Sequence, residues 1–409
     1  RKTTMQPETS RAVVEPFILD LGGDAQVSAS FDTAGYRLEL NGPLEWRRAM
    51  QVARMLGLQA PATDLQGSGL LTALYSGEWQ HFGPPTVFGK AQIRSATLSL
   101  SGLSEPLRVS GGTLTFDAQS VHAEQIHGIF PRSDLAFIGD FNGARQCDRH
   151  LMCNVTFDLK TEDLREGALL KLLSPSPGGL SLPFFNSERQ LEAKWLLEVP
   201  VSGSIAARHL SIHNLQADNM SAQLQLAAGK ILVQRWSAEI FGGMHEGEWA
   251  FDLSGARPTI TGTGSIKEGR AEELDVMLGE TLGSGSFDLD YRLAMSGLNA
   301  NQLASSTTGT GLFAWRNGEL RAVHSEGEHS SPLAFSSWTG RFTIDKQRIA
   351  LQNSKMTSTS GVREVSGEIS FNREWNLKFL RANGSGFIAT GTVNNPVVAS
   401  EPAKLAEAR

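Results

Sequence analysis

The sequence predicts a mainly β protein: an elongated, curved antiparallel sheet, arranged as a β-groove or a taco-like stack of repeated units, with a few short helices. Apolar residues fall on every second position in run after run, as at Phe287, Leu289, Tyr291 and Leu293. Glycines, 42 in number, recur at the ends of these runs, where hairpin turns require them. Strands with one apolar and one polar face are typical of antiparallel sheets, because buried parallel strands are apolar throughout.

Composition indicates a soluble, folded protein. The chain has 409 residues, of which 40% are hydrophobic and 20% are charged. At roughly 150 residues per domain, this length suits two or three domains or one elongated stack of repeated units. The net charge of -6 is spread along the chain, so nucleic acid is not an expected partner. The sequence contains no run of about 20 apolar residues, so it predicts no membrane-spanning helix. From its two ends we expect the chain to be a fragment or a mature form.

Strands are predicted along most of the chain. The clearest alternating runs, in chain order, are 35–42, 97–102, 113–118, 154–160, 248–255, 283–296 and 375–380. Each run places its apolar side chains on one face and its polar side chains on the other.

Three helices are predicted, each after such a strand. They span 43–58, with Pro43 in the first turn, 161–173, with Thr161 as the N-cap, and 267–278. A fourth strand, 287–295, is followed by a weaker helical pattern. The recurrence of strand and helix favours a stack of similar modules over a single globular core.

Composition shifts divide the chain into four segments. We expect an N-terminal region of β-rich groove units with short helices at 1–173, and a linker or loop rich in Ser, Pro and Gly at 174–190. A second β-groove region follows at 191–393. A flexible tail is expected at 394–409.

The second half of the chain resembles the AsmA family of bacterial envelope proteins. The resemblance rests on the order TGTGSI, a helix containing EELDVMLGE, and then GSGSFDLDYRLAMSGLNANQLASSTTGTGLFAWRNGEL. It also rests on a final hairpin that matches the family pattern at Gly309, Gly311, Leu312, Trp315, Gly318 and Leu320. The similarity is clear over 205–323 and extends back to Val155.

The resemblance implies a location and a ligand. Members of the family have an N-terminal anchor in the inner membrane and a periplasmic body of repeated β-groove units that holds lipid acyl chains. By this resemblance, we expect a non-enzymatic protein of the cell envelope that binds or conveys phospholipid or another acyl lipid. Its expected role is in outer-membrane biogenesis or homeostasis, with other envelope proteins as further expected partners. This chain lacks the anchoring helix, so attachment to the inner membrane would depend on a segment outside it.

Alternating apolar residues are the candidates for contact with lipid. Large exposed apolar surfaces usually mark binding sites, and a curved sheet covered by only a few short helices leaves such a surface. The candidate lipid-facing residues are Phe157, Trp249, Phe251, Leu253, Phe287, Leu289, Tyr291 and Leu293. The alternative is that these side chains form the dry core of a β-sandwich or β-solenoid, in which case the protein would be a secreted or surface interaction module such as an adhesin.

Catalytic motifs are absent from the sequence. It contains no G-x-S-x-G elbow, no H-E-x-x-H and no phosphate-binding loop, so no catalytic residue, cofactor or metal site is expected. Asp288 and Asp290 alternate onto the solvent face of a strand, and a β-rich hydrolase that uses them is a remote alternative.

Cys147 and Cys153 are the two cysteines of the chain, with His150 between them. In an oxidising compartment, a disulfide that closes a short loop is the simplest interpretation. Two free thiols, or a metal or redox site, remain alternatives.

Overall fold

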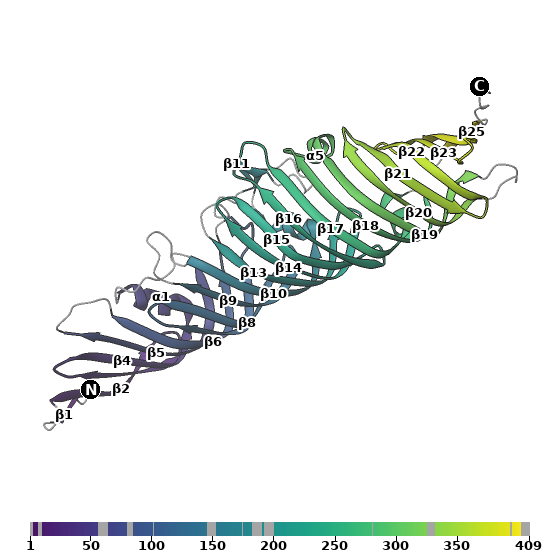
Figure 1. Ribbon diagram of the computed structural model, residues 1–409. Coiled ribbons are helices and arrows are strands. Elements are labelled where there is room, and N and C mark those ends of the chain that lie inside the picture. Colours follow the sequence, from purple (N-terminus) through teal and green to yellow (C-terminus); the bar gives the residue numbers. More distant parts are fainter. Residues whose placement is uncertain are drawn as a thin grey trace. The chain divides into compact units, whose positions relative to one another are not determined.

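Strands dominate the computed structural model, and its helices are short (Figure 1). The structure describes residues 3–6, 10–55, 64–79, 85–100, 102–144, 153–173, 175–181, 190–191, 200–279, 281–324, 332–392 and 395–401. Neighbouring strands run antiparallel in both halves of the chain. The predicted fold class, mainly β and antiparallel with a few short helices, is therefore confirmed.

The strands are mostly ten or more residues long. Their bounds are β1 Thr3–Gln6, β2 Arg11–Asp20, β3 Asp24–Phe31, β4 Gly35–Glu45, β5 Leu65–Glu78, β6 Thr86–Leu98, β7 Leu107–Phe116, β8 Ser120–Phe130, β9 Leu135–Ala144, β10 Cys153–Arg165, β11 Pro175–Ser181, β12 Gln190–Leu191, β13 Val201–Ile212, β14 Leu215–Ala227, β15 Lys230–Ile240, β16 Gly243–Asp252, β17 Thr259–Arg270, β18 Gly283–Ser296, β19 Thr308–His324, β20 Pro332–Asp345, β21 Arg348–Ser358, β22 Gly361–Ser370, β23 Glu374–Leu380, β24 Gly386–Thr392 and β25 Asn395–Glu401. The helices are α1 Trp46–Met55, α2 Glu166–Leu172, α4 Ala271–Leu278 and α5 Ala300–Ser306.

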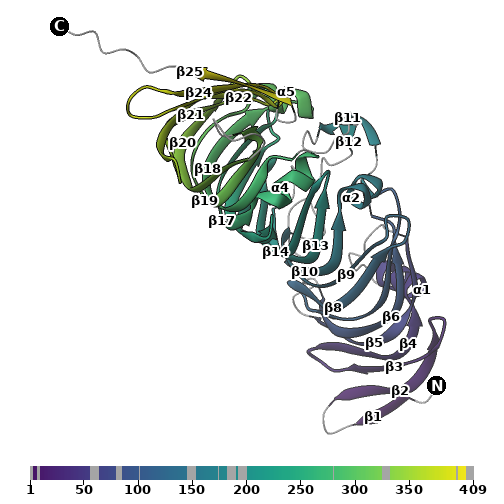
Figure 2. The ribbon, with the colours of Figure 1, turned by 90° about the vertical axis from the view of Figure 1, so that its right-hand side faces the viewer.

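The chain divides into two compact units. The first comprises Arg1–Ser176, Leu191–Ala206 and Gln225–Ala228, and the second comprises Pro177–Gln190, Ala207–Leu224 and Gly229–Arg409. In the first unit, β1 to β10 pair in chain order, each strand with the next. In the second, β15 to β25 pair in the same way. Each unit is therefore a meander, and its strands are visibly curved (Figure 2).

Part of the core of the first unit lies between its strands and α1. Trp46, the first residue of α1, is 6% exposed, and its indole Nε1 donates to the carbonyl oxygen of Ser95 at 2.9 Å. The ring lies against Gly69 of β5, where any side chain would collide with it. Leu44, which is 1% exposed, packs in the same cluster. Helix α1 thus covers part of the apolar side of this sheet, and α2 covers another part through Ala168 and Leu172.

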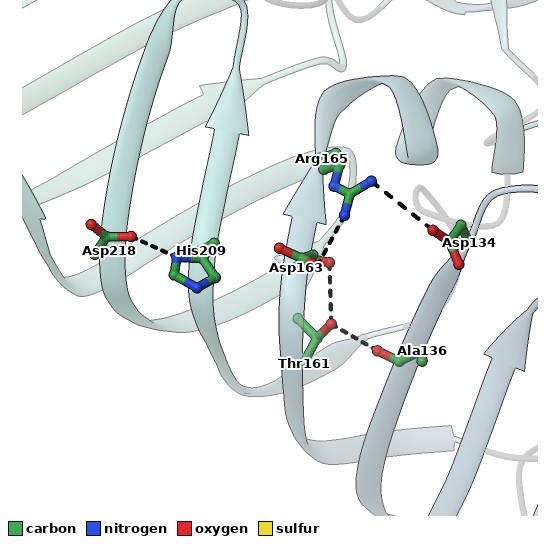
Figure 3. Close-up of polar contacts among 7 residues, drawn as sticks. All are labelled: Asp134, Ala136, Thr161, Asp163, Arg165, His209 and Asp218. Carbon is green, nitrogen blue, oxygen red and sulfur yellow. Dashed lines mark hydrogen bonds and ion pairs between the residues drawn. The ribbon is translucent and has the colours of Figure 1, made fainter.

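The helices begin later than the sequence predicts, because the preceding strands are longer. β4 continues through Glu45, which pairs with Ser68, and β17 continues through Arg270, which pairs with Ser286. Cross-strand hydrogen bonds therefore extend strand structure into segments with helical sequence patterns. Thr161 is not an N-cap, because it lies inside β10 and its hydroxyl donates to the carbonyl oxygen of Ala136 at 2.7 Å (Figure 3).

The predicted flexible tail is wrong for part of its length. Asn395–Glu401 forms β25, which pairs with β24, so that Val398 lies opposite Ala389. Residues 394 and 402–409 are outside the described part of the chain, as are most of 174–190. The described parts of the latter segment belong to β11 and β12, which form a separate two-stranded sheet.

The predicted disulfide falls on residues that the structure describes only in part. Cys147 lies outside the described residues, whereas the backbone of Cys153 begins β10 opposite Ala144. The pairing of the two cysteines stays a prediction.

Candidate functional site

One face of β15, β16, β17 and β18 carries apolar side chains in four rows that cross all four strands. Alternation along each strand and the register between strands place these residues on a common face. The rows are Ile231–Phe251–Ile260–Met295, Val233–Trp249–Gly262–Leu293, Trp236–Gly247–Gly264–Tyr291 and Ala238–His245–Ile266–Leu289. We refer to this surface as the apolar face.

The apolar face is only partly covered. Ile260 and Ile266 of the third strand are 3% and 5% exposed, whereas Trp249, Tyr291 and Leu293 on the flanking strands are half-buried. Helix α4 connects β17 to β18 and α5 connects β18 to β19, so the two helices lie at opposite ends of β18. The middle of the strands therefore keeps apolar surface within reach of a ligand.

Glycines lie opposite the aromatic residues of the apolar face and leave space for their rings. Trp249 pairs with Gly262, and a Cβ atom at that glycine would collide with the indole. Tyr291 pairs with Gly264, whose Cβ would lie 2.7 Å from the tyrosine hydroxyl oxygen. Because these glycines have no side chain, the rings can lie across the sheet.

The opposite face of the same strands is polar. Lys267 forms an ion pair with Asp290 at 3.2 Å, and Arg316 forms one with Asp288. The backbone N–H of Glu268 also donates to Asp288 at 2.9 Å, and this bond is the main reason that the pKa of Asp288 is lowered. The two carboxylates lie on the solvent side, where the sequence predicts them, each bound to a cation.

The eight predicted lipid-facing residues do not share one environment. Trp249, Phe251, Leu289, Tyr291 and Leu293 lie half-buried on the apolar face. Phe157 is also half-buried, but it belongs to β10 in the first unit. Leu253 and Phe287 are 4% and 8% exposed, so these two side chains are core.

Packing explains the burial of Phe287. Its ring covers Gly269 of β17, and its centroid lies 6.4 Å from that of Phe241. Leu253 directly follows β16, and its backbone N–H donates to the carbonyl oxygen of Gly229 at 2.8 Å. Alternation predicts the face of Phe287 correctly, but it does not show that Leu253 lies beyond the end of its strand or that both side chains are covered.

A polar cluster lies within the apolar face, and the sequence pattern did not reveal it. Trp236 Nε1 donates to His245 Nδ1 at 2.7 Å, and His245 Nε2 lies 2.7 Å from the Tyr291 hydroxyl. The imidazole stacks on the tyrosine ring, with 5.9 Å between centroids. The three residues come from three strands, and the row Trp236–Gly247–Gly264–Tyr291 leaves room for the imidazole over its glycines.

Burial shifts the protonation of this cluster toward its neutral forms. His245 is 4% exposed, and burial lowers its pKa, with a smaller opposing effect from Glu246. Burial also raises the pKa of Tyr291 to about 12. Both side chains are therefore uncharged at neutral pH.

A recess of about 380 Å³ borders the row that contains Val233, Trp249 and Leu293. Most of the residues that line it, including Glu248, Ala250, Thr261 and Arg292, alternate onto the opposite face. The recess is open and lies mainly on the polar side of the sheet, so it does not form a binding pocket on the apolar face.

Metal ligands do not gather in the part of the chain that the structure describes. No group of three or more His, Cys, Asp and Glu side chains there is placed to hold an ion. His209 instead binds Asp218, with 2.7 Å between Nδ1 and the carboxylate oxygen (Figure 3). Within the same described ranges, no helix is both long enough and apolar enough to cross a membrane.

Comparison with known proteins gives no relative. No protein-family model matches the chain, and neither a curated protein nor a solved structure matches it.

Proposed function

We propose that this protein binds acyl lipid on the apolar face and conveys it within the bacterial cell envelope. The observation that carries the proposal is the partial cover of this face: Trp249, Tyr291 and Leu293 are half-buried, although their strands continue into a well-packed meander. Apolar surface that the fold itself leaves uncovered favours an apolar ligand.

Acyl chains fit this surface energetically. Burial of a methylene group contributes about 0.8 kcal/mol. Transfer of a chain of roughly sixteen carbons from an apolar surface into water would therefore cost on the order of 13 kcal/mol of free energy. Flat aromatic rings over Gly262 and Gly264 provide a broad floor for such a chain. The lipid headgroup would stay in water at the open side of the sheet, and movement along the strands would need no chemical step.

The proposed function is not enzymatic. The titratable side chains of the apolar face, His245 and Tyr291, are bound to one another and neutral at physiological pH. Asp288 and Asp290 are bound to cations on the opposite face. These contacts favour passive binding, without a cofactor or a metal.

Location and physiological role follow from the resemblance of 205–323 to the AsmA family. On this basis, we propose a periplasmic protein that is attached to the inner membrane through a segment outside this chain. Its role would be in outer-membrane biogenesis or homeostasis. Phospholipid is the proposed cargo, and other envelope proteins would deliver or receive it.

Native mass spectrometry of the purified chain, with lipid extraction from the same sample, tests the proposal. We expect co-purified acyl lipid in the wild-type protein and its loss in Leu293→Asp. Leu312→Asp is the matched control, because Leu312 lies on the adjacent strand, is 49% exposed and points to the opposite face. A folded wild-type chain that takes up no lipid from vesicles would contradict the proposal.

An interaction module is the second candidate, and the C-terminal strands favour it. There the same face is closed by a cluster that includes Phe379 and Phe387, both 0% exposed. If β15–β18 were covered as completely in solution, lipid would be absent and the polar faces would carry the function.

A further inference from the structure

The direction of each hydrogen bond in the polar cluster can be assigned. An indole N–H only donates, so His245 Nδ1 must accept from Trp236. The proton of a neutral imidazole then resides on Nε2, which donates to the hydroxyl oxygen of Tyr291. A second proton on Nδ1 would point at the indole N–H. Trp236 therefore fixes the tautomer of His245, and His245 fixes the position of the Tyr291 hydroxyl.

The Tyr291 hydroxyl keeps its own hydrogen available for another acceptor. Its oxygen accepts from His245, so the O–H group must donate elsewhere, and no further hydrogen bond joins it to the described part of the chain. The tyrosine is half-buried and borders Trp249, with 6.1 Å between ring centroids. The donor thus stands on the apolar face, beside the surface proposed to hold an acyl chain.

The electrostatic surroundings favour a neutral acceptor. Along β16 and β18, the charged neighbours Glu246, Asp290 and Arg292 alternate onto the opposite face. A carboxylate on the apolar face would lack a cation, and an uncompensated charge is costly to remove from water. An ester carbonyl carries no charge and needs one donor, which Tyr291 supplies.

We propose that the Tyr291 hydroxyl donates a hydrogen bond to the ester carbonyl of an acyl lipid that lies along β16–β18. His245 and Trp236 act as positioning residues for this donor. The inference rests on the proposed lipid-binding function and adds a chemical preference: esterified acyl chains bind better than ether-linked chains of equal length.

A competition between ester and ether lipids tests this preference. The purified chain is exposed to vesicles that contain equal amounts of dipalmitoyl phosphatidylcholine and its dihexadecyl ether analogue, and the bound lipids are extracted and compared by mass spectrometry. These lipids share headgroup and chain length but differ at the carbonyl. We expect the wild-type protein to hold about three- to tenfold more ester lipid, which corresponds to one neutral hydrogen bond.

The variants separate the hydroxyl from the lipid-binding face. Tyr291→Phe should bring the ratio close to equality while total bound lipid stays similar, because the apolar surface is retained. Tyr36→Phe, which removes a hydroxyl from the first unit, should keep the wild-type ratio. Equal binding of the two lipids by the wild-type protein would overturn the role of Tyr291 and leave lipid binding intact. Binding of neither lipid would overturn both proposals.

Discussion

The apolar face of β15–β18 and the C-terminal core of the same unit are built from the same alternating pattern, yet only one of them is closed. In the C-terminal core, the rings of Phe379 and Phe387 stack with 4.6 Å between centroids, and neither side chain is exposed. Trp249 and Leu293 on the apolar face remain half-buried. The difference shows that alternation determines which face of the sheet is apolar. Whether that face is buried depends on whether a strand farther along the chain packs against it.

The C-terminal core is closed by strands that are not neighbours in the sheet, because the ring centroids of Trp338 in β20 and Phe379 in β23 lie 6.3 Å apart. β25 packs against β19, six strands earlier in the chain, so the C-terminal meander curls back on itself. Trp315 and Trp338 stack within this curl, with 5.8 Å between centroids. A core of this kind excludes water and ligand alike, which leaves the apolar face as the candidate for binding within this unit.

The largest effect is expected from a cavity in the C-terminal core. Phe379→Ala should lower the free energy of unfolding by about 3–5 kcal/mol, because the ring is completely buried and its neighbours cannot fill the space. Urea denaturation followed by tryptophan fluorescence measures the change. A loss below about 1 kcal/mol would mean that this core is as open as the apolar face, and the comparison would fail.

A smaller effect is expected where a glycine lies beneath an aromatic ring. Gly262→Ala should cost about 1–3 kcal/mol, because the added methyl group collides with the indole of Trp249. The same denaturation experiment measures the change. Gly167→Ala is the control, because nothing lies within 4 Å of its added Cβ. Gly279→Ala is not suitable as a control, because the φ angle of Gly279 is positive. An unchanged stability in Gly262→Ala would show that the ring can move away from the sheet.

Acid should weaken the second unit through His245. Burial holds the pKa of this imidazole below its ordinary value, so below a pH of about 6.5 the unfolded chain binds a proton that the folded chain does not. Stability should therefore fall as the pH is lowered from there, by at most about 1.4 kcal/mol per pH unit for one proton, and level off below the folded pKa. His245→Gln should lose this part of the pH dependence; a variant that retains it would assign the dependence to other groups.

The smallest effect on stability is expected on the apolar face itself. Leu293→Ala should cost only about 1 kcal/mol, because the leucine is only half-buried in the folded chain. Its effect on lipid occupancy should be larger than its effect on unfolding. A destabilisation equal to that of Phe379→Ala would identify Leu293 as core and remove it from the binding surface.

Helix prediction shows where local patterns compete with strand pairing. The segment from Pro43 to Glu45 has a helical sequence pattern, but the structure pairs it with β5. Thr161 has the chemistry of an N-cap, yet its hydroxyl bonds across to β9. α5, in contrast, begins at a true cap, because Asn299 Oδ1 accepts from the N–H of Gln302 at 3.0 Å. In the first two cases, the segment forms hydrogen bonds with the adjacent strand of the sheet and is therefore not helical.

The candidate site was predictable only in part. Five of the eight predicted residues lie together on the apolar face, because a period of two places them there whatever the pairing. His245 was not predicted, since a lone histidine in a strand gives no sign of partners on two other strands. Trp236 and Tyr291 are 55 residues apart in the numbering, and only the register brings both to the same imidazole.

The sequence by itself determined the mainly β class, the antiparallel pairing and the division of each strand into an apolar and a polar face. These properties follow from local periodicity and turn residues, which act between neighbours along the chain. Tertiary structure alone decided that Trp338 of β20 packs on Phe379 of β23, that Leu293 stays partly uncovered and that three strands assemble a hydrogen-bonded donor at Tyr291. Cover and register depend on contacts between residues far apart in the chain, and no local pattern specifies them.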